Sequence, residues 1–342
     1  MFEKFEHANL SELHFHADES TQLKSIIAIH STLRGPALGG CRCVEYASED
    51  EAINDVVRLA KGMSYKAALA NVPQGGGKAV IIKPPEIENR NALYQSFGKF
   101  VDGLGGRYIT AVDSGSHLSD MDQVQQVTSY VSGCTSDGFD PSPLTALGVF
   151  CGIQAALQHR RGNNSLQGIR VAIQGLGNVG FALAELLHKA GATLIVCDIN
   201  KAKQRLCEQK FGAISVPPED IYQVPCDVFS PCGLGAILND QTIPHLQCEY
   251  IAGSANNQLL APNHGEILHQ RGILYAPDYV INAGGLIQVS LGLNHIAQAD
   301  ILKKTTDIGK TLRQIFERSD KDNISTHTIA DQLAEDILQV KH

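Results

Sequence analysis

Hydrophobic residues in the first part of the chain follow two different patterns, one typical of strands and one typical of helices. Short β-branched runs at residues 25–30 and 80–82 are bounded by polar or turn residues, as strands usually are. Between them, apolar residues recur every three or four positions over 48–68, and Ser48 with Glu51 supplies a capping box, so a helix is predicted there. The same criteria predict a helix over 91–104 and a strand over 108–112. This part is therefore expected to be mixed α/β.

Strands and helices alternate regularly after residues 133–143, where Gly, Pro, Ser and Asp are concentrated and a hinge is predicted. Such alternation with short connections is typical of a parallel, doubly wound sheet. At about 150 residues per domain, 342 residues also indicate two domains. We predict an α/β protein with a first domain over 1–132 and a second over 133–322. The expected elements are helices over 144–159, 179–190, 305–316 and 328–340, and strands at 170–174, 193–197, 228–229, 250–252 and 273–275.

Composition excludes several classes of function. The net charge of −8 argues against a nucleic-acid partner, which requires a basic surface. No apolar run is long enough to cross a membrane, and because residues 1–10 are polar we expect no signal peptide. Nine cysteines without a CxxC motif indicate a reducing compartment, and we expect a cytoplasmic protein. No histidine or cysteine spacing favours a metal site, so none is expected.

A glycine-rich turn follows the strand at 170–174 and opens a helix, which predicts a dinucleotide site. The first glycine permits the tight turn, the second lets the backbone approach a pyrophosphate, and the third lets helix and strand pack closely. Asp198 ends the next strand, where it would bind the ribose hydroxyls and repel a 2′-phosphate, so NAD is favoured over NADP. The alternative is a turn that only packs a helix, with Asp198 capping the next one. The turn comprises Gly175, Leu176, Gly177, Asn178, Val179 and Gly180.

Two lysines flank a run of three glycines at residues 75–77. Such a run is costly in a strand or helix, and it fits a place where the backbone passes close to a small ligand. If Lys66 and Lys78 share one pocket, one amine can act as a neutral base while the other stays charged and holds a carboxylate. Asp113, at the end of a predicted strand, could donate and accept protons. Spacing alone leaves open a surface Lys66 and a turn-forming Asp113.

At these residues the sequence resembles the glutamate/leucine/phenylalanine/valine dehydrogenase family, and most closely its leucine and phenylalanine branch. The similar stretches follow one another along nearly the whole chain. The resemblance implies an NAD-dependent L-amino-acid dehydrogenase of two domains, with the active site in the cleft between them and the C-terminal helix, 323–342, packed back on the first domain. The matching residues are 35–40, 58–66, 75–78, 108–113, 140–145, 175–180, 239–244, 251–258 and 275–285.

The resemblance also implies a role for each matching residue. Lys66 binds the substrate α-carboxylate, near the backbone of Gly39 and Gly40. Lys78 activates water and stabilises the developing carbinolamine, and Asp113 carries protons to and from the amine. The remaining implied residues are Leu38, Ala111, Leu286 and Val289 around the substrate side chain, Thr145 and Asn257 near the nicotinamide, and Cys232 and Gly233 in a loop lining the cofactor.

The nature of the pocket predicts the substrate. Members of the family that use glutamate have a lysine and a serine where this chain has Leu38 and Val289, and an unpaired γ-carboxylate beside these apolar residues would be costly. Leucine, valine and isoleucine are therefore favoured, with phenylalanine or tryptophan as the alternative. The expected partners are the amino acid, its 2-oxo acid and ammonia, in a homodimer or higher homo-oligomer. A non-catalytic NAD-binding regulator and a 2-hydroxy-acid dehydrogenase are competing hypotheses, although the His/Arg arrangement of the latter has no match here.

Overall fold

The computed structural model describes residues 9–138, 140–294 and 296–339, which form two compact units. The first unit runs to Asp140 and includes the short segments that begin at Val289 and Ala334. The second comprises Pro141–Gln288 and Ile296–Leu333. Residues 1–8, where no signal peptide is expected, and 340–342, the end of the predicted last helix, lie outside the described residues. No described helix is both long and apolar enough to cross a membrane.

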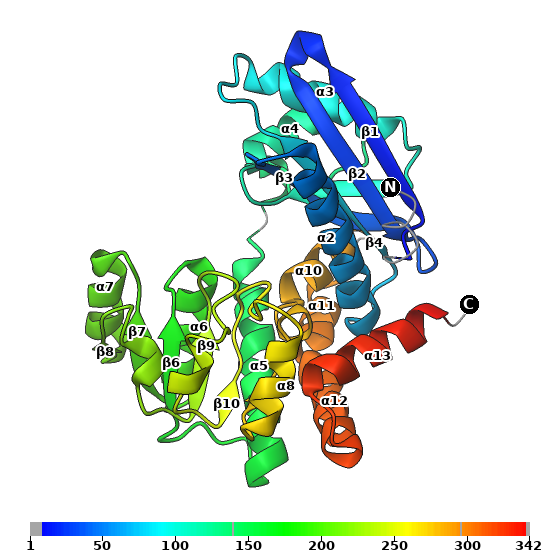
Figure 1. Ribbon diagram of the computed structural model, residues 1–342. Helices are drawn as coiled ribbons and strands as arrows, with labels where there is room; N and C mark the ends of the chain where they lie inside the picture. Colours follow the sequence, from blue (N-terminus) through cyan, green and yellow to red (C-terminus); the bar gives the residue numbers. More distant parts are fainter. Residues whose placement is uncertain (1–8, 139, 295, 340–342) are drawn as a thin grey trace. The chain divides into compact units, whose positions relative to one another are not determined.

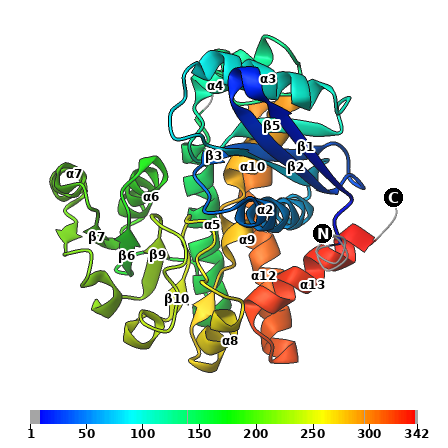
Figure 2. The same cartoon turned by 45° about the horizontal axis from the view of Figure 1, so that its top comes forward.

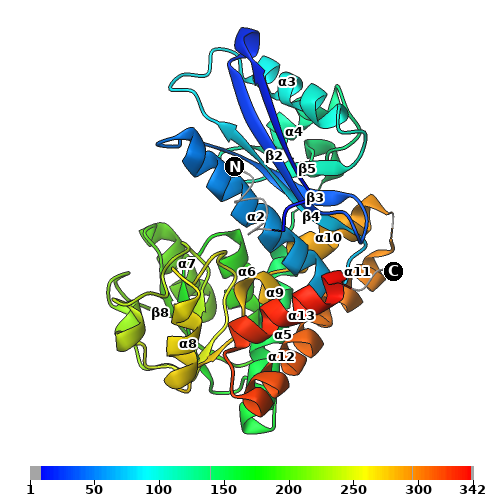
Figure 3. The same ribbon diagram turned by 45° about the vertical axis from the view of Figure 1, so that its right-hand side comes forward.

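The first unit is built on a five-stranded sheet in the order β1-β2-β4-β3-β5 (Figures 1 and 3). β1 and β2 are antiparallel at one edge, whereas β3 runs parallel to both of its neighbours, β4 and β5. Helix α2 packs on one face of the sheet, and α3 and α4 cover the other (Figure 2). The elements are β1 Glu12–Asp18, β2 Leu23–Ser31, β3 Ala37–Val44, α2 Glu49–Leu69, β4 Gly75–Ile82, α3 Arg90–Asp102, β5 Tyr108–Val112 and α4 Leu118–Gln125, with 3-10 turns at η1 Glu19–Thr21 and η2 Thr135–Asp137.

Helix α2 forms where the periodicity predicts it. The Ser48 hydroxyl accepts a hydrogen bond from the Glu51 N–H (3.2 Å), which satisfies one of the free donors at the helix N-terminus. The buried stripe that includes Ala52, Val56 and Ala60 packs against apolar side chains of β2 and β4. Burial of such a stripe on a sheet provides most of the stability of a helix in a protein. The helix thereby fixes the positions of the residues near its C-terminal end, including Lys66.

The second unit contains a six-stranded, entirely parallel sheet in the order β11-β10-β9-β6-β7-β8, so the predicted doubly wound sheet is confirmed. Its core contains Phe229, Ile251 and Leu268 on one face. The elements are α5 Ser142–Arg161, β6 Arg170–Gln174, α6 Asn178–Lys189, β7 Thr193–Cys197, α7 Lys201–Phe211, β8 Ile214–Ser215, η3 Ile221–Gln223, β9 Val228–Pro231, η4 Ile243–His245, β10 Tyr250–Ile251, α8 Asn263–Gln270, β11 Leu274–Tyr275, α9 Asp278–Ile281, α11 Gln298–Thr306 and α12 Ile308–Asp322. Helices α10 Gly284–Leu293 and α13 Thr326–Gln339 contribute residues to both units.

The boundary between the units differs from the predicted one after residue 132. The chain stays attached to the first unit beyond that point, because Cys134 Sγ donates to Met121 O (3.6 Å) and the Thr135 N–H donates to Asp122 (2.8 Å). The division therefore falls between Asp140 and Pro141.

Residues 323–342 are predicted to pack back on the first domain, but only their last part belongs to the first unit. Thr326 Oγ1 donates to Tyr275 O (2.6 Å), which holds the start of α13 within the second unit. From Ala334 onward the described residues belong to the first unit, where Tyr65 Oη donates to Glu335 Oε1 (2.5 Å).

Candidate active site

The first unit brings a buried lysine and an aspartate into direct contact. Lys78 lies on β4 and is only 4% exposed, and its ammonium donates to Asp113 Oδ2. Asp113 directly follows β5, and its backbone N–H donates to Ser116 Oγ (2.9 Å), while Ser116 Oγ donates to Cys41 O (2.8 Å). A short turn tied to β3 therefore holds the carboxylate against the lysine.

The environment of Asp113 favours the ionised carboxylate. Burial would raise its pKa, but the charge of Lys78 and its hydrogen bond, the Ser114 N–H (2.6 Å) and the charge of Arg42 outweigh this effect and lower the pKa to about 2. A buried carboxylate stays charged only where such partners compensate its lost hydration. At neutral pH the site therefore presents an anion that can accept a proton.

The glycines around this pair are required by packing. A Cβ on Gly39 would come within 1.8 Å of Gly77 O, and one on Gly76 within 2.0 Å of the Ser64 nitrogen. A Cβ on Gly40 would lie 2.8 Å from Asp113 Cβ. Contacts with other protein atoms therefore already account for glycine in the run 75–77, and a ligand close to its backbone remains a prediction. These glycines let α2, β3 and β4 approach closely and so hold Lys78 beside Asp113.

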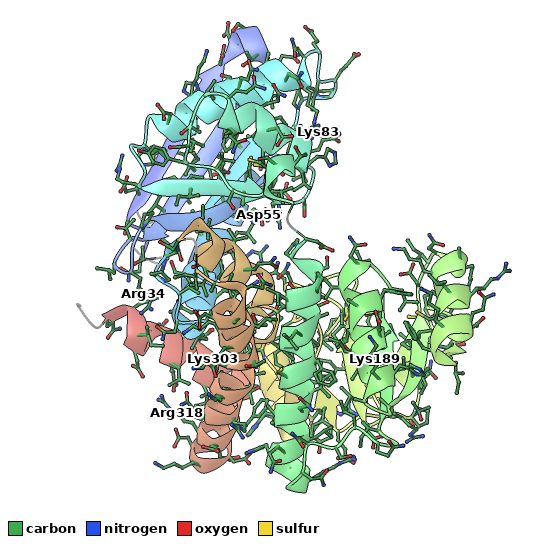
Figure 4. All side chains as sticks on the ribbon, turned by 180° about the vertical axis from the view of Figure 1, so that it is seen from behind. Arg34, Asp55, Lys83, Lys189, Lys303 and Arg318 are labelled. Carbon is green, nitrogen blue, oxygen red and sulfur yellow. The ribbon has the colours of Figure 1, made fainter. Side chains whose placement is uncertain are left out.

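Arg42 and Asp55 extend the charged cluster behind Asp113. Arg42 lies on β3, and its Nε donates to Asp113 Oδ1 at 3.4 Å while its Nη1 donates to Asp55 Oδ2 at 2.8 Å. Asp55, on α2 and labelled in Figure 4, also accepts hydrogen bonds from Tyr46 Oη (2.9 Å) and Arg58 Nη2 (3.0 Å). Burial opposes the charged form of Asp55, but the Arg42 charge and these hydrogen bonds lower its pKa.

The second unit contains the glycine turn at the carboxyl end of β6. Gly175 has φ +95°, and a Cβ there would lie 2.8 Å from Gly233 Cα. A Cβ on Gly180 would come within 2.1 Å of Gly175 O, so the helix packs directly on the turn. At Gly177, the N-cap of α6, an added Cβ would meet nothing within 4 Å. There is therefore space beside Gly177 at the N-terminus of α6, where the first N–H groups of a helix lack intrahelical partners and the helix dipole is positive.

Asp198 lies beside this turn. Its Oδ2 accepts from the Leu176 N–H (2.6 Å) and its Oδ1 from the Asn200 N–H (2.7 Å). The N-cap of α7 is Asn200, whose side chain accepts from the Ala202 N–H, so the alternative of Asp198 as a helix cap does not hold. The Cys232 N–H donates to Gln174 O (2.7 Å), which places the loop after β9 next to the glycine turn.

Comparisons with known proteins assign the chain to a family. Residues 7–130 match the model described as "Glu/Leu/Phe/Val dehydrogenase, dimerisation domain", and residues 141–203 and 196–331 match "Glutamate/Leucine/Phenylalanine/Valine dehydrogenase". This protein belongs to the glutamate/leucine/phenylalanine/valine dehydrogenase family. The family resemblance seen in the sequence motifs is thus confirmed, as is the two-domain α/β fold.

Individual relatives within this dehydrogenase family differ in their named substrates. The chain is 47% identical to a leucine dehydrogenase of Geobacillus stearothermophilus, over 99% of this chain and 93% of the relative. It is 45% identical to a phenylalanine dehydrogenase of Caldalkalibacillus thermarum, over 94% and 89%. The crystal structure of an L-tryptophan dehydrogenase from Nostoc punctiforme superposes with a TM-score of 0.89 at 42% identity, covering 99% and 98% of the two chains. The relatives are amino acid dehydrogenases, so the prediction of an oxidoreductase of this class is confirmed.

The structure of this dehydrogenase gathers the residues predicted from the motifs into two groups. The first unit holds Lys66, Lys78, Asp113, Gly39, Gly40, Leu38, Ala111 and Val289, and the second holds the glycine turn, Asp198, Thr145, Cys232, Gly233, Asn257 and Leu286. Lys66 is half-buried near the end of α2, two residues after the contact between Ser64 and Gly76. Thr145 Oγ1 donates to Pro141 O (2.9 Å) and lies 3.0 Å from the Cβ position of Gly285, next to Leu286. Asn257 has φ +52°, and its carbonyl accepts from the Ala236 N–H (2.6 Å).

Four residues near the site in the first unit were not predicted from the sequence. A charged residue between two cysteines in β3 is the signal that would have identified Arg42. Asp55 has no such signal, because it is one of several charged residues of the amphipathic helix α2. Gln74 and Ser290 are buried and hydrogen-bonded to each other, which ties the start of β4 to the part of α10 that carries Val289. This pair has no sequence signal, because its members lie far apart in the chain.

Proposed function

We propose that this protein catalyses the NAD-dependent oxidative deamination of an apolar L-amino acid to its 2-oxo acid and ammonia. The observation that carries the proposal is the Lys78–Asp113 pair, a buried amine in contact with an ionised carboxylate. Such a pair supplies a proton acceptor and a proton donor within reach of each other. The high identity to named amino acid dehydrogenases along nearly the whole chain supports the same reaction.

The residues of the second unit fit a dinucleotide. The N-terminus of α6 at Gly177 offers the positive end of the helix dipole and space for a pyrophosphate, and Asp198 offers a carboxylate at the end of β7 for ribose hydroxyls. Cys232 and Gly233 would line the same loop, and Thr145 and Asn257 the nicotinamide end. Bound NAD would supply the hydride acceptor for the substrate Cα.

The residues of the first unit would perform the proton transfers. Lys66 would hold the substrate α-carboxylate, together with the backbone of Gly39 and Gly40. Asp113 would take a proton from the substrate ammonium, so that the nitrogen lone pair can form the imine as the hydride leaves. After releasing its own proton, the Lys78 amine would take one proton from the water that attacks the imine carbon. Asp113 would return its proton to the nitrogen, and the remaining hydroxyl proton would leave with ammonia as ammonium when the carbonyl forms.

The apolar residues assigned to the substrate side chain favour branched aliphatic substrates. Leu38 is buried, and Ala111 and Val289 are half-buried in the same unit. None of these side chains can pair a γ-carboxylate. We expect kcat/KM for leucine, valine or isoleucine to exceed that for glutamate by roughly 100-fold or more, because an uncompensated buried charge costs several kcal/mol. The measurement is NADH absorbance with a panel of amino acids at alkaline pH.

The same panel separates the competing functions. Higher kcat/KM for phenylalanine or tryptophan than for leucine would make this an aromatic amino acid dehydrogenase, as the similar identity to such relatives allows. Greater activity on glutamate would overturn the pocket assignment. A flat absorbance trace with every amino acid, despite NAD binding, would favour a regulatory protein.

The Asp198 carboxylate should also decide between the two nicotinamide cofactors. A 2′-phosphate beside this carboxylate is repelled, so we expect kcat/KM for NADP to be roughly 100-fold below that for NAD. Asp198→Ser should narrow this ratio by weakening NAD binding, whereas Asp220→Ser, an exposed aspartate of the same unit, should leave it unchanged. Equal turnover with both cofactors in the wild type would contradict the assignment.

Assembly and location belong to the same proposal. We expect a homodimer or higher homo-oligomer, since the model matched by residues 7–130 is described as a dimerisation domain. All nine cysteines are free in the structure, which is compatible with the reducing cytoplasm. Sedimentation of the purified protein tests the first expectation directly.

A further inference from the structure

Arg42 occupies an unusual position for a charged residue. It lies in β3 between two buried cysteines, and its side chain is 22% exposed. Its guanidinium is shared between two carboxylates from different elements, Asp113 after β5 and Asp55 on α2. Partial burial of a guanidinium is costly unless its charge and its hydrogen bonds are compensated. Two carboxylate partners provide this compensation, and one of them is the proton-transfer residue assigned above.

We propose that Arg42, anchored by Asp55, is a positioning residue that keeps Asp113 ionised and oriented when the Lys78 amine turns from Asp113 to the substrate and water. This inference rests on the proposed function. Arginine suits the task because its guanidinium stays protonated throughout the pH range of the enzyme, whereas the lysine must exchange protons. Asp55 holds Nη1 at 2.8 Å, which leaves Nε directed at Asp113 at 3.4 Å.

Asp55 also limits how strongly Arg42 acts. A guanidinium devoted entirely to Asp113 would make that carboxylate a weaker base, because a nearby positive charge lowers proton affinity. Asp55 offsets most of the Arg42 charge, while its other arginine partner, Arg58, is exposed to solvent, so Asp113 receives orientation with only part of a positive charge. Other described groups that interact electrostatically with Asp113 include Lys78 from β4, the thiol of Cys41 from β3, Tyr108 from β5 and Tyr46, whose hydroxyl donates to Asp55.

Removal of Arg42 and removal of Asp55 should shift the pH profile in opposite directions. Arg42→Gln removes a positive charge, so the Lys78–Asp113 pair should hold its proton more tightly and the ascending limb of the pH profile should move up by about one unit. Asp55→Asn leaves the Arg42 charge uncompensated, so the limb should move down by about half a unit. The double variant should return close to the wild-type position. The signs hold whichever member of the pair titrates.

The test is the pH dependence of kcat/KM for the best amino acid of the panel at saturating NAD. Arg107→Gln and Glu12→Gln remove the members of another ion pair of the same unit and are the matched controls, for which the limb should stay in place. Thermal unfolding of every variant identifies general destabilisation. Rates that fall equally at all pH values, or limbs that move in the same direction in both single variants, would show a merely structural role and overturn the inference.

A second measurement does not depend on turnover. The carboxyl carbon of Asp113, labelled with carbon-13, reports its own protonation by chemical shift in the wild type and in both single variants. Asp113 should titrate at higher pH in Arg42→Gln and at lower pH in Asp55→Asn, and the reverse order would overturn the inference. If no amino acid yields NADH, the proposed function fails, and this titration still decides whether Arg42 and Asp55 control Asp113.

Discussion

Lys78→Ala is expected to lose about a thousandfold in kcat while it binds NAD as tightly as the wild type does. The amine is buried, and its loss removes both the base for the attacking water and the cation that faces Asp113. Loss of a single positioned acid–base group typically costs 10²- to 10⁴-fold, roughly the size expected here. The glycine turn belongs to the other unit, so its contacts with the cofactor should be unaffected. Stopped-flow turnover and fluorescence titration with NAD measure the two quantities.

Two further variants make this result interpretable. Lys83→Ala removes an exposed lysine just after the same strand, one that pairs with Glu45 at 3.0 Å, and it should retain wild-type activity. Lys78→Arg keeps a cation beside Asp113 and should therefore be more stable than Lys78→Ala. A guanidinium does not release a proton near neutral pH, so turnover should stay low. Wild-type kcat in Lys78→Arg, or loss of NAD binding in Lys78→Ala, would contradict the role assigned to the amine.

The parts of the fold that follow a local period could be predicted from the sequence. Helix α2 and strands β6 and β7 lie within one or two residues of their expected positions, because each has an apolar stripe or run bounded by clear end signals. β3 was missed because its Ala-Leu-Gly-Gly-Cys-Arg-Cys-Val sequence contains two glycines and an arginine, which obscure a strand. Its register with β4 and β5 is a tertiary property that no local pattern encodes.

Residues of the candidate site could be predicted from the sequence only where they belong to a recognisable motif. The glycine turn with Asp198 could be recognised from its local spacing, because each of its residues has a specific structural role. The lysines and Asp113 became candidates through the family resemblance. Arg42 and Asp55 belong to different elements, and their charges meet only once β3 lies against α2 and the turn at Asp113. Long-range pairing of this kind is set by packing, so the sequence could predict the reacting groups but not the charges that support them.

Asp113→Asn is expected to lower kcat by about a thousandfold, because an amide of nearly the same shape cannot accept the substrate proton or return it. The substitution also leaves the Lys78 and Arg42 cations without the carboxylate they share. The affinity for NAD should be unchanged, which separates a chemical defect from unfolding. Asp300→Asn, at an exposed aspartate in the first turn of α11, is the matched control and should keep full activity.

The stability difference between the wild type and Asp113→Asn should depend on pH in a direction that the pKa of Asp113 fixes. The pKa of Asp113 is lowered from 3.8 to about 2 in the folded protein, so its ionised form stabilises the fold above pH 4. That contribution, roughly 2 kcal/mol, disappears as the pH falls from about 4 to about 2, because the unfolded chain then binds the proton more readily than the folded one. Urea unfolding of the wild type and Asp113→Asn should therefore give a difference that is constant near neutral pH and shrinks below about pH 4. A difference that stays constant through this range would show that the Asp113 carboxylate is not held ionised by Lys78 and Arg42, and the chemical role assigned to that pair would lose its physical basis.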